Sequence, residues 1–237
     1  MTMSNHVAGQ PFQRDRATSA QYQINRKAAS HVGPPLPQVP SDETIDYWGI
    51  RRRWIHHAGG RYDEQFFYPL AFAQSIADLD ANRWPEVSWF DYSQMRAQAA
   101  QRHTTHLVKC GYMAPFYYHN LLRGLEQSLI DPLMEPEFTH VLVQRISDFF
   151  YAHHRAMFVA CEGLIDVAEV TDDLGSQRGP LISPKLYDEF YAPHHKRFID
   201  LCHEFGVLVF HHDDGAIRPF LPRLVEMGID ILNPVQW

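Results

Sequence analysis

The chain has 237 residues, of which 45% are hydrophobic and 21% are charged, a composition that fits a soluble globular domain with one sizeable core. Acidic residues outnumber basic ones by 28 to 21, so the formal net charge is −7 and nothing resembles a nucleic-acid footprint. No apolar run approaches the length of a membrane span, and the N-terminus has no apolar signal region. We therefore expect neither nucleic acid nor membrane as a partner.

The cysteines indicate a reducing compartment. Cys110, Cys161 and Cys202 are odd in number and lie in or beside apolar periodic segments, which is typical of buried thiols rather than of a disulfide framework. Disulfides are rare in the cytoplasm, so we expect a cytoplasmic protein.

The N-terminal part of the chain differs from the rest. Residues 1–40 lack sustained periodicity and end in the proline-rich run 33–40, which predicts a flexible leader. One domain, 41–237, follows it. Its first part, 46–89, is rich in aromatic residues among Gly and Pro, which predicts short strands rather than long helices.

Strand and helix patterns alternate after residue 100. Predicted strands are 106–110, 165–170, 207–211 and 229–232, and a Tyr/Phe-rich loop, 112–119, follows the first of them. Predicted helices are 120–134, 136–161, 183–205 with a division at Pro193, and 218–227. This order predicts a parallel sheet with outer helices, either an open doubly wound sheet or a barrel.

Polar residues follow the predicted strands at their carboxyl ends. They are Tyr117, Tyr118 and His119, then Asp172 and Asp173, then His212 and Asp214, then Asn233 and Gln236. This distribution is typical of a TIM-barrel active site. A whole barrel takes about 250 residues, whereas 237 − 40 = 197 remain after the leader. The sequence therefore predicts a partial TIM (β/α)₈ barrel.

The pattern His212-x-Asp214 carries the clearest chemical signal. Side chains two residues apart on an extended strand point to the same side, so the imidazole and the carboxylate can both reach one ion. Zinc accepts these ligands, usually with a third protein ligand. The alternative is that these residues form a solvent-exposed turn after the strand, in which Gly215 is the turn-forming glycine.

Each of the other polar residues has two possible roles. Asp172 and Asp173 could supply an acid/base group with a raised pKa, or could cap the following turn and face solvent. Gln177 and Arg178 could orient an anionic substrate, the alternative for Arg178 being a surface ion pair. Tyr118 and His119 could line a pocket or pack in the core.

The segments 170–179 and 182–187 resemble the uroporphyrinogen decarboxylase (URO-D) superfamily, which also contains cobalamin-dependent, zinc-containing methyltransferases. The resemblance continues through His212-x-Asp214-Gly215, 217–222 and 228–236, and includes 62–64, 69–71 and Trp84-Pro85. It is strongest to an uncharacterised branch related to the methyltransferases. It implies a (β/α)₈ barrel that is truncated here, so we expect low stability or a homo-oligomer for the isolated chain.

The resemblance implies two activities. In the methyltransferases, zinc is held by a His-x-Cys pair that matches His212-x-Asp214, and the methyl group passes between a small substrate and a corrinoid on a partner protein. This chain has Asp214 where the family has Cys. The decarboxylases of porphyrin biosynthesis act as lyases without a cofactor. They clamp substrate carboxylates with Arg side chains, and their Gln-Ala-Gly-Arg motif has only a superficial likeness in 58–61. A non-catalytic fragment is the third hypothesis.

The resulting site prediction has three parts. The metal ligands are His212 and Asp214. The catalytic residues are Asp172, Asp173 and Arg178, and the substrate-binding residues are Tyr118, His119, Gln177, Asn233 and Gln236.

Overall fold

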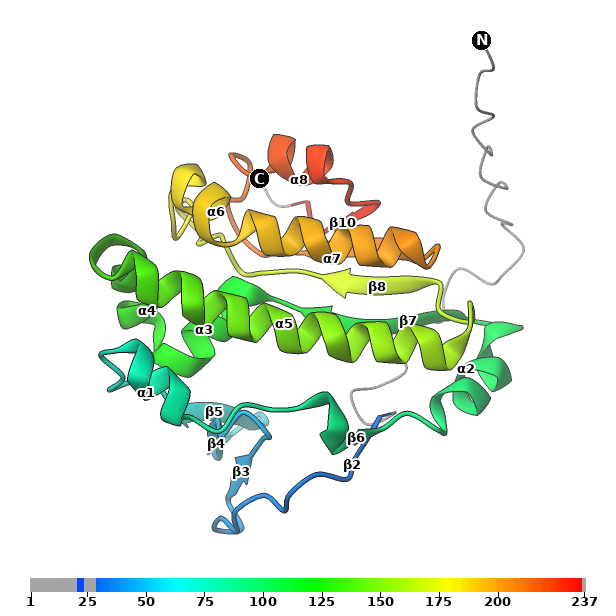
Figure 1. The fold of residues 1–237 in the computed structure, drawn as a ribbon, viewed down its shortest axis with the longest axis horizontal. Helices are drawn as coiled ribbons and strands as arrows, with labels where there is room; N and C mark the ends of the chain where they lie inside the picture. Colours follow the sequence, from blue (N-terminus) through cyan, green and yellow to red (C-terminus); the bar gives the residue numbers. More distant parts are fainter. Residues whose placement is uncertain (1–20, 24–28, 236–237) are drawn as a thin grey trace.

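The structure, a computed structural model, describes residues 21–23 and 29–235 and contains a five-stranded parallel sheet (Figure 1). The strand order is β1 (Gln21–Gln23), β7 (Leu107–Met113), β8 (Val167–Val170), β9 (Leu208–His212) and β10 (Ile231–Asn233). All four neighbouring pairs are parallel, as in the register Ala168↔Val209. The predicted parallel sheet is confirmed.

Helices connect the strands and cover one face of the sheet. They are α5 (Pro136–Cys161), α6 (Pro184–Phe190), α7 (Ala192–Glu204) and α8 (Leu221–Met227). Figure 1 shows α5 and α7 lying side by side across β7 and β8. Buried side chains of this sheet face meet the helices, since Cys110 Sγ lies 3.5 Å from Met157 Sδ of α5. Consecutive parallel strands with outer helices are the arrangement found in part of a TIM barrel.

The opposite face of the sheet carries a partly polar row. Lys109 Nζ lies 2.6 Å from Glu169 Oε2 and 4.4 Å from the centre of the Phe210 ring. Glu169 pairs with Phe210 in register, whereas Lys109 pairs with Val167, two residues before Glu169, so the three side chains lie on one face of the sheet. An ion pair with 15% and 11% side-chain exposure therefore lies on the face turned away from α5 and α7.

The aromatic segment forms short elements, as predicted. Strands β3 (Glu43–Ile45), β4 (Arg51–His57) and β5 (Gly60–Phe67) make an antiparallel sheet, and β2 (Ser30–His31) pairs with β6 (Phe90–Asp91). The remaining helices before β7 are α1 (Ile76–Ala81), the 3-10 turn η1 (Val87–Trp89) and α2 (Met95–His103). Ser75 and Asp78 form a capping box at the start of α1.

Strand β7 continues past Gly111, where the sequence predicted its end. Gly111 has φ of 92°, and its pairing with β8 is irregular between Cys110 and Met113. The imidazole of His154 takes the place of a strand partner, because its Nε2 accepts the Tyr112 N–H at 2.9 Å. Burial lowers the pKa of His154 to about 3, so this nitrogen keeps its lone pair at neutral pH.

The predicted loop 112–119 is wrong from residue 115 onward, since α3 (Pro115–Arg123) begins there. The first turn is stabilised from elsewhere in the chain: Asp172 accepts the N–H groups of Phe116 at 3.1 Å and Tyr117 at 2.7 Å. The predicted helix 120–134 is also two helices, because Gly124 with φ of 86° separates α3 from α4 (Leu125–Met134).

The later elements agree with their predictions, with shifted ends. Ser183 caps α6 by accepting the Leu186 N–H at 3.2 Å, and α7 starts afresh with Pro193 in its first turn. Helix α8 begins at Leu221 rather than at 218. In the described part of the chain, no helix is both long and apolar enough to cross a membrane.

Candidate active site at the strand ends

Four predicted site residues meet where β8, β9 and β10 end: Asp173, His212, Asp214 and Asn233. We call them the strand-end cluster. His212 Nε2 lies 3.7 Å from Asp214 Oδ2, and His212 Nδ1 lies 3.1 Å from Asn233 Oδ1. Burial raises the pKa of Asp173. The charge of His212 lowers this pKa and the charge of Asp214 raises it, so Asp173 interacts electrostatically with both residues. The side chains of His212 and Asp214 remain 36% and 64% exposed.

The hydrogen bond to Asn233 fixes how His212 presents its ring. Because a carbonyl oxygen only accepts, His212 Nδ1 is the donor in this contact, and Nε2 is the ring nitrogen that faces Asp214 Oδ2. Two ligand atoms each about 2.0–2.2 Å from one zinc ion can lie 3.7 Å apart, so the pair fits two positions of a zinc site. Residues 29–235 contain no group of three or more His, Cys, Asp or Glu placed to hold a metal ion.

Two loops fix the backbone of the cluster. The Ala216 N–H donates to Ser176 O at 2.9 Å, and the Asp172 N–H and the Thr171 hydroxyl both donate to His212 O. A Cβ at Gly175 would lie 2.5 Å from Asp214 O, and one at Gly215 would lie 2.7 Å from Ser176 O. Only glycine permits backbones to pack this closely, so the loops after β8 and β9 are held together.

The side chain of Asp172 contacts α3 and α7 instead of the members of the strand-end cluster, and its catalytic role stays a prediction. Its carboxylate is buried, caps α3 and lies 3.0 Å from His195 Nε2. Burial raises the pKa of Asp172 against the opposing effect of the Tyr117 and Phe116 amides. Asp172 thus caps a helix that is distant in sequence rather than the following turn, while its neighbour Asp173 belongs to the cluster.

Tyr118 and His119 are packed in the core, as their second interpretation proposed. The Tyr118 ring contacts Trp48 and Phe150 at centroid distances of 5.1 and 4.6 Å. His119 is fully buried and bonds to Tyr191 and Asp131 at 2.9 and 3.1 Å. They are buried because α3 packs this part of the chain against α4 and α5 rather than leaving it as a loop.

The remaining predicted site residues, Gln177, Arg178 and Gln236, are not members of the strand-end cluster. Gln177 and Arg178 are exposed at the tip of a turn closed by the Ser176 N–H, which donates to Gly179 O at 2.8 Å. Within the described part of the chain, no hydrogen bond or ion pair links Gln177 or Arg178 to the strand-end cluster, and Gln236 lies outside the described residues.

Sequence reasoning missed the buried pair His211 and Asp213, which alternates with His212 and Asp214. Both side chains are fully buried, and His211 Nε2 lies 3.7 Å from Asp213 Oδ2. Burial raises the pKa of Asp213 to about 7, although His211 lowers it. The run of two His and two Asp contained the signal, because alternation places the second pair on the opposite face of the strand.

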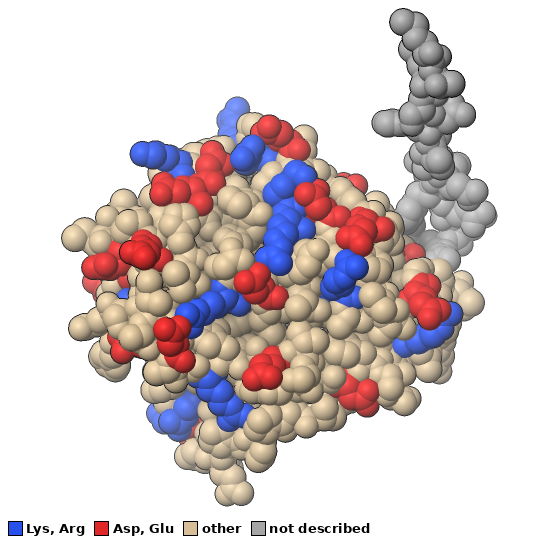
Figure 2. Space-filling model, in the orientation of Figure 1, with Lys and Arg blue, Asp and Glu red and all other residues tan. Residues whose placement is uncertain are grey.

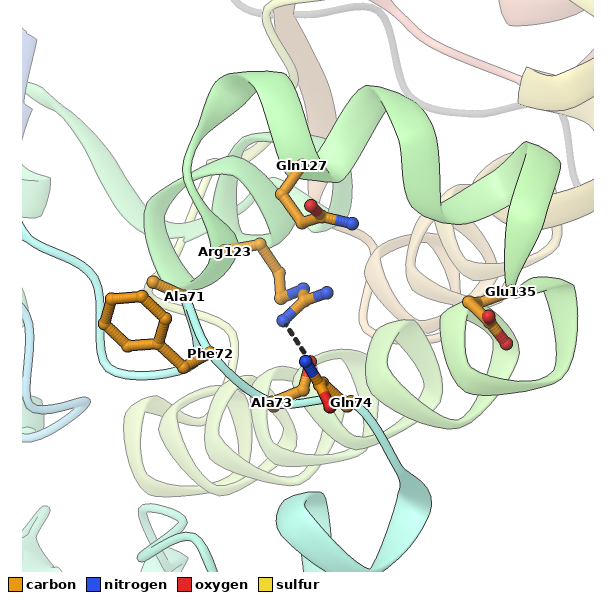
Figure 3. A pocket seen from close by; sticks show the side chains of 7 residues that line it. All are labelled: Ala71, Phe72, Ala73, Gln74, Arg123, Gln127 and Glu135. Carbon is orange, nitrogen blue, oxygen red and sulfur yellow. Dashed lines mark hydrogen bonds between the residues drawn. The ribbon is translucent and has the colours of Figure 1, made fainter.

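A separate cavity of about 460 Å³ lies beside α4, lined by Phe72, Gln74, Gln127, Glu135 and others (Figure 3). Arg123 extends into this region, but its guanidinium is already engaged. Nε and Nη2 bind Asp131 at 2.7 and 3.0 Å, and Nη1 binds Ala73 O at 2.7 Å. Arg123 therefore ties the segment before α1 to α4.

Charges on the face covered by α5 and α7 alternate in sign (Figure 2). Exposed ion pairs on these helices include Arg197 with Asp148 at 2.5 Å and Lys196 with Asp200 at 2.5 Å. This face therefore has no single-sign patch, and the strand-end cluster remains the best-organised group of polar side chains for chemistry.

Comparison with known proteins agrees with the sequence pattern. No curated protein matches the chain. A solved structure of a methyltransferase from Methanosarcina mazei is similar, with 17% sequence identity and a TM-score of 0.49; the match covers 73% of this chain and 49% of that one. This chain thus spans about half the length of that structure. The model of the uroporphyrinogen decarboxylase (URO-D) family matches residues 92–234, which include the whole strand-end cluster, and the chain therefore belongs to the URO-D family.

Proposed function

We propose that the protein is a metal-dependent, methyltransferase-like enzyme of the URO-D superfamily, moving a methyl group between a small substrate and a corrinoid carried by a partner protein. The proposal rests on one observation: His212 Nε2 faces Asp214 Oδ2 at 3.7 Å while Asn233 holds Nδ1. Ligating histidines almost always have their other ring nitrogen bound in this way. Membership of the family supports the same position for the site.

The chain's own residues have distinct roles in this proposal. His212 and Asp214 are two ligands, and the other ligands come from water, substrate or a residue outside the described part. When bound, zinc would stabilise a substrate thiolate or act as a Lewis acid on an ether oxygen. Asn233 orients the His212 ring. Asp173, whose pKa burial raises, is the group placed to take up or release a proton beside the pair.

A decarboxylase-like lyase is the second candidate, and the description of the matching family model favours it. This chemistry needs no metal, but it needs cationic side chains for the substrate carboxylates. Arg178, exposed at the tip of the turn after β8, is a predicted site residue of that kind. The two candidates therefore differ in whether the His212–Asp214 pair holds an ion.

Metal content by mass spectrometry tests the proposal. We expect near-stoichiometric zinc in the wild type and its loss in the double variant His212→Ala, Asp214→Ala. The matched control is His203→Ala, Asp230→Ala, which removes another exposed His–Asp contact, of 3.1 Å, and should retain zinc. If none of the three proteins binds zinc, the metal-dependent proposal fails and decarboxylation of a porphyrinogen becomes the activity to assay.

A further inference from the structure

We propose that Asp213 is the positioning residue of the strand-end cluster, holding the three loops that carry its members in one arrangement. The inference rests on the proposed function, because it assigns a role to a buried residue within the same site. Asp213 is fully buried and lies between the two predicted ligands His212 and Asp214 in the sequence. It therefore cannot act on a substrate directly.

Asp213 contacts both neighbouring loops. Its Oδ1 accepts the Leu174 N–H at 3.0 Å, which fixes the loop that carries Asp173. Its own N–H donates to Asn233 O at 3.1 Å, which fixes the end of β10. Each member of the cluster is therefore Asp213's sequence neighbour, its hydrogen-bond partner, or the neighbour of a partner.

The surroundings of the second carboxylate oxygen of Asp213, Oδ2, show whether the residue acts through its negative charge or through its hydrogen bond to Leu174. His211 Nδ1 lies 2.8 Å from Val170 O, which only accepts, so Nδ1 carries the proton and Nε2 is a bare lone pair. This lone pair faces Asp213 Oδ2 across 3.7 Å, and neither atom has a hydrogen-bond partner among the residues that the structure describes. In Asp213→Asn, the amide oxygen could keep the bond to Leu174 while the NH₂ group turned toward His211. In Asp213→Ala, the bond to Leu174 is lost.

These contacts predict an effect on metal affinity. Loss of a residue that orients a ligand typically weakens metal binding about 10–100-fold. We therefore expect Asp213→Ala to weaken Co²⁺ binding about 10–100-fold and Asp213→Asn to stay within about threefold of wild type. A residue needed only for its charge would weaken Co²⁺ binding equally in the two variants, because both lack the carboxylate charge.

The control removes a similar contact at the other end of the same strands. Asp230 Oδ2 accepts the Val209 N–H at 2.7 Å, joining β10 to β9 far from the cluster. Asp230→Ala should lower the melting temperature without changing Co²⁺ affinity. Equal weakening of Co²⁺ binding by Asp230→Ala and Asp213→Ala would show a general loss of stability and overturn the proposal.

The experiment combines Co²⁺ titration, followed by visible absorption of the bound ion, with amide hydrogen exchange of the wild type and the three variants. Asp213→Ala should speed exchange of the Leu174 amide about tenfold or more, whereas Asp213→Asn and Asp230→Ala should not. If Asp213→Ala fails to fold, a tenfold loss of affinity in Asp213→Asn still overturns the role. If the wild type binds no Co²⁺, the metal-dependent function fails. The role of Asp213 is tested separately: if the Leu174 amide exchanges at the wild-type rate in the Asp213 variants that fold, Asp213 does not position the loop.

Discussion

The buried carboxylate of Asp131 allows a strong test of what holds the α3–α4 region together. It accepts hydrogen bonds from Arg123 Nε at 2.7 Å, Arg123 Nη2 at 3.0 Å, His119 at 3.1 Å and Gln127 at 2.7 Å. Burial would raise the pKa of Asp131, but the hydrogen bonds from His119, Arg123 and Gln127 together hold it well below its ordinary range. The ionised form is therefore the stabilising one at neutral pH.

The variant Asp131→Asn removes this charge and leaves the Arg123 guanidinium, with a side chain only 5% exposed, without its counter-ion. Breaking a buried ion pair in this way costs about 3–5 kcal/mol. Domains are stable by only about 5–15 kcal/mol, so the loss should be a large fraction of the total. We expect a clear fall in the urea midpoint at pH 7.

The matched control is Asp148→Asn, which removes an exposed partner of Arg197. The two side chains are 53% and 41% exposed, so this pair should contribute less than about 1 kcal/mol. Urea unfolding followed by circular dichroism gives both values by linear extrapolation. Equal losses in the two variants would refute the argument that burial makes the Asp131 pair essential. If Asp131→Asn does not fold, Gln127→Met, which removes one bond to the same carboxylate, should still cost about 1–2 kcal/mol.

Two further predictions concern the sheet and its histidines. Gly111→Ala places a Cβ 2.5 Å from His154 Cδ2 at a φ of 92°, so it should lower the free energy of unfolding by more than about 1 kcal/mol. The control is Gly163→Ala, which has open space around it and a φ of 78°, so it measures the cost of the backbone strain alone. Burial lowers the pKa of His195 to about 4, with the Thr171 carbonyl opposing it. A depressed histidine pKa contributes stability that is lost as the pH falls below the unfolded value of about 6.5, amounting to about 2 kcal/mol at pH 5. The difference in unfolding free energy between wild type and His195→Gln should therefore shrink by about 2 kcal/mol between pH 7 and pH 5, and a constant difference would contradict the neutral buried imidazole.

The pairing of His212 with Asp214 followed from local rules. An apolar strand followed by His-x-Asp places both side chains on one side of an extended chain, and in the structure His212 Nε2 lies 3.7 Å from Asp214 Oδ2. The order of strands and helices likewise determined the parallel sheet, because each strand needs a helical crossover to return in parallel. These properties depend on periodicity and on residues near one another in sequence.

The separation of Asp172 from Asp173, and the burial of Tyr118 and His119, were decided by tertiary structure. Asp172 caps a helix whose first turn is 55 residues away in sequence, and the sequence predicted a loop there because the stabilising carboxylate lies in the distant segment after β8. The role of Asp213 has the same origin, since its partner Leu174 lies 39 residues away. Alternation could place Asp213 on the same side of the chain as His211, which faces α7, but only the packed loops determine which amide its carboxylate holds.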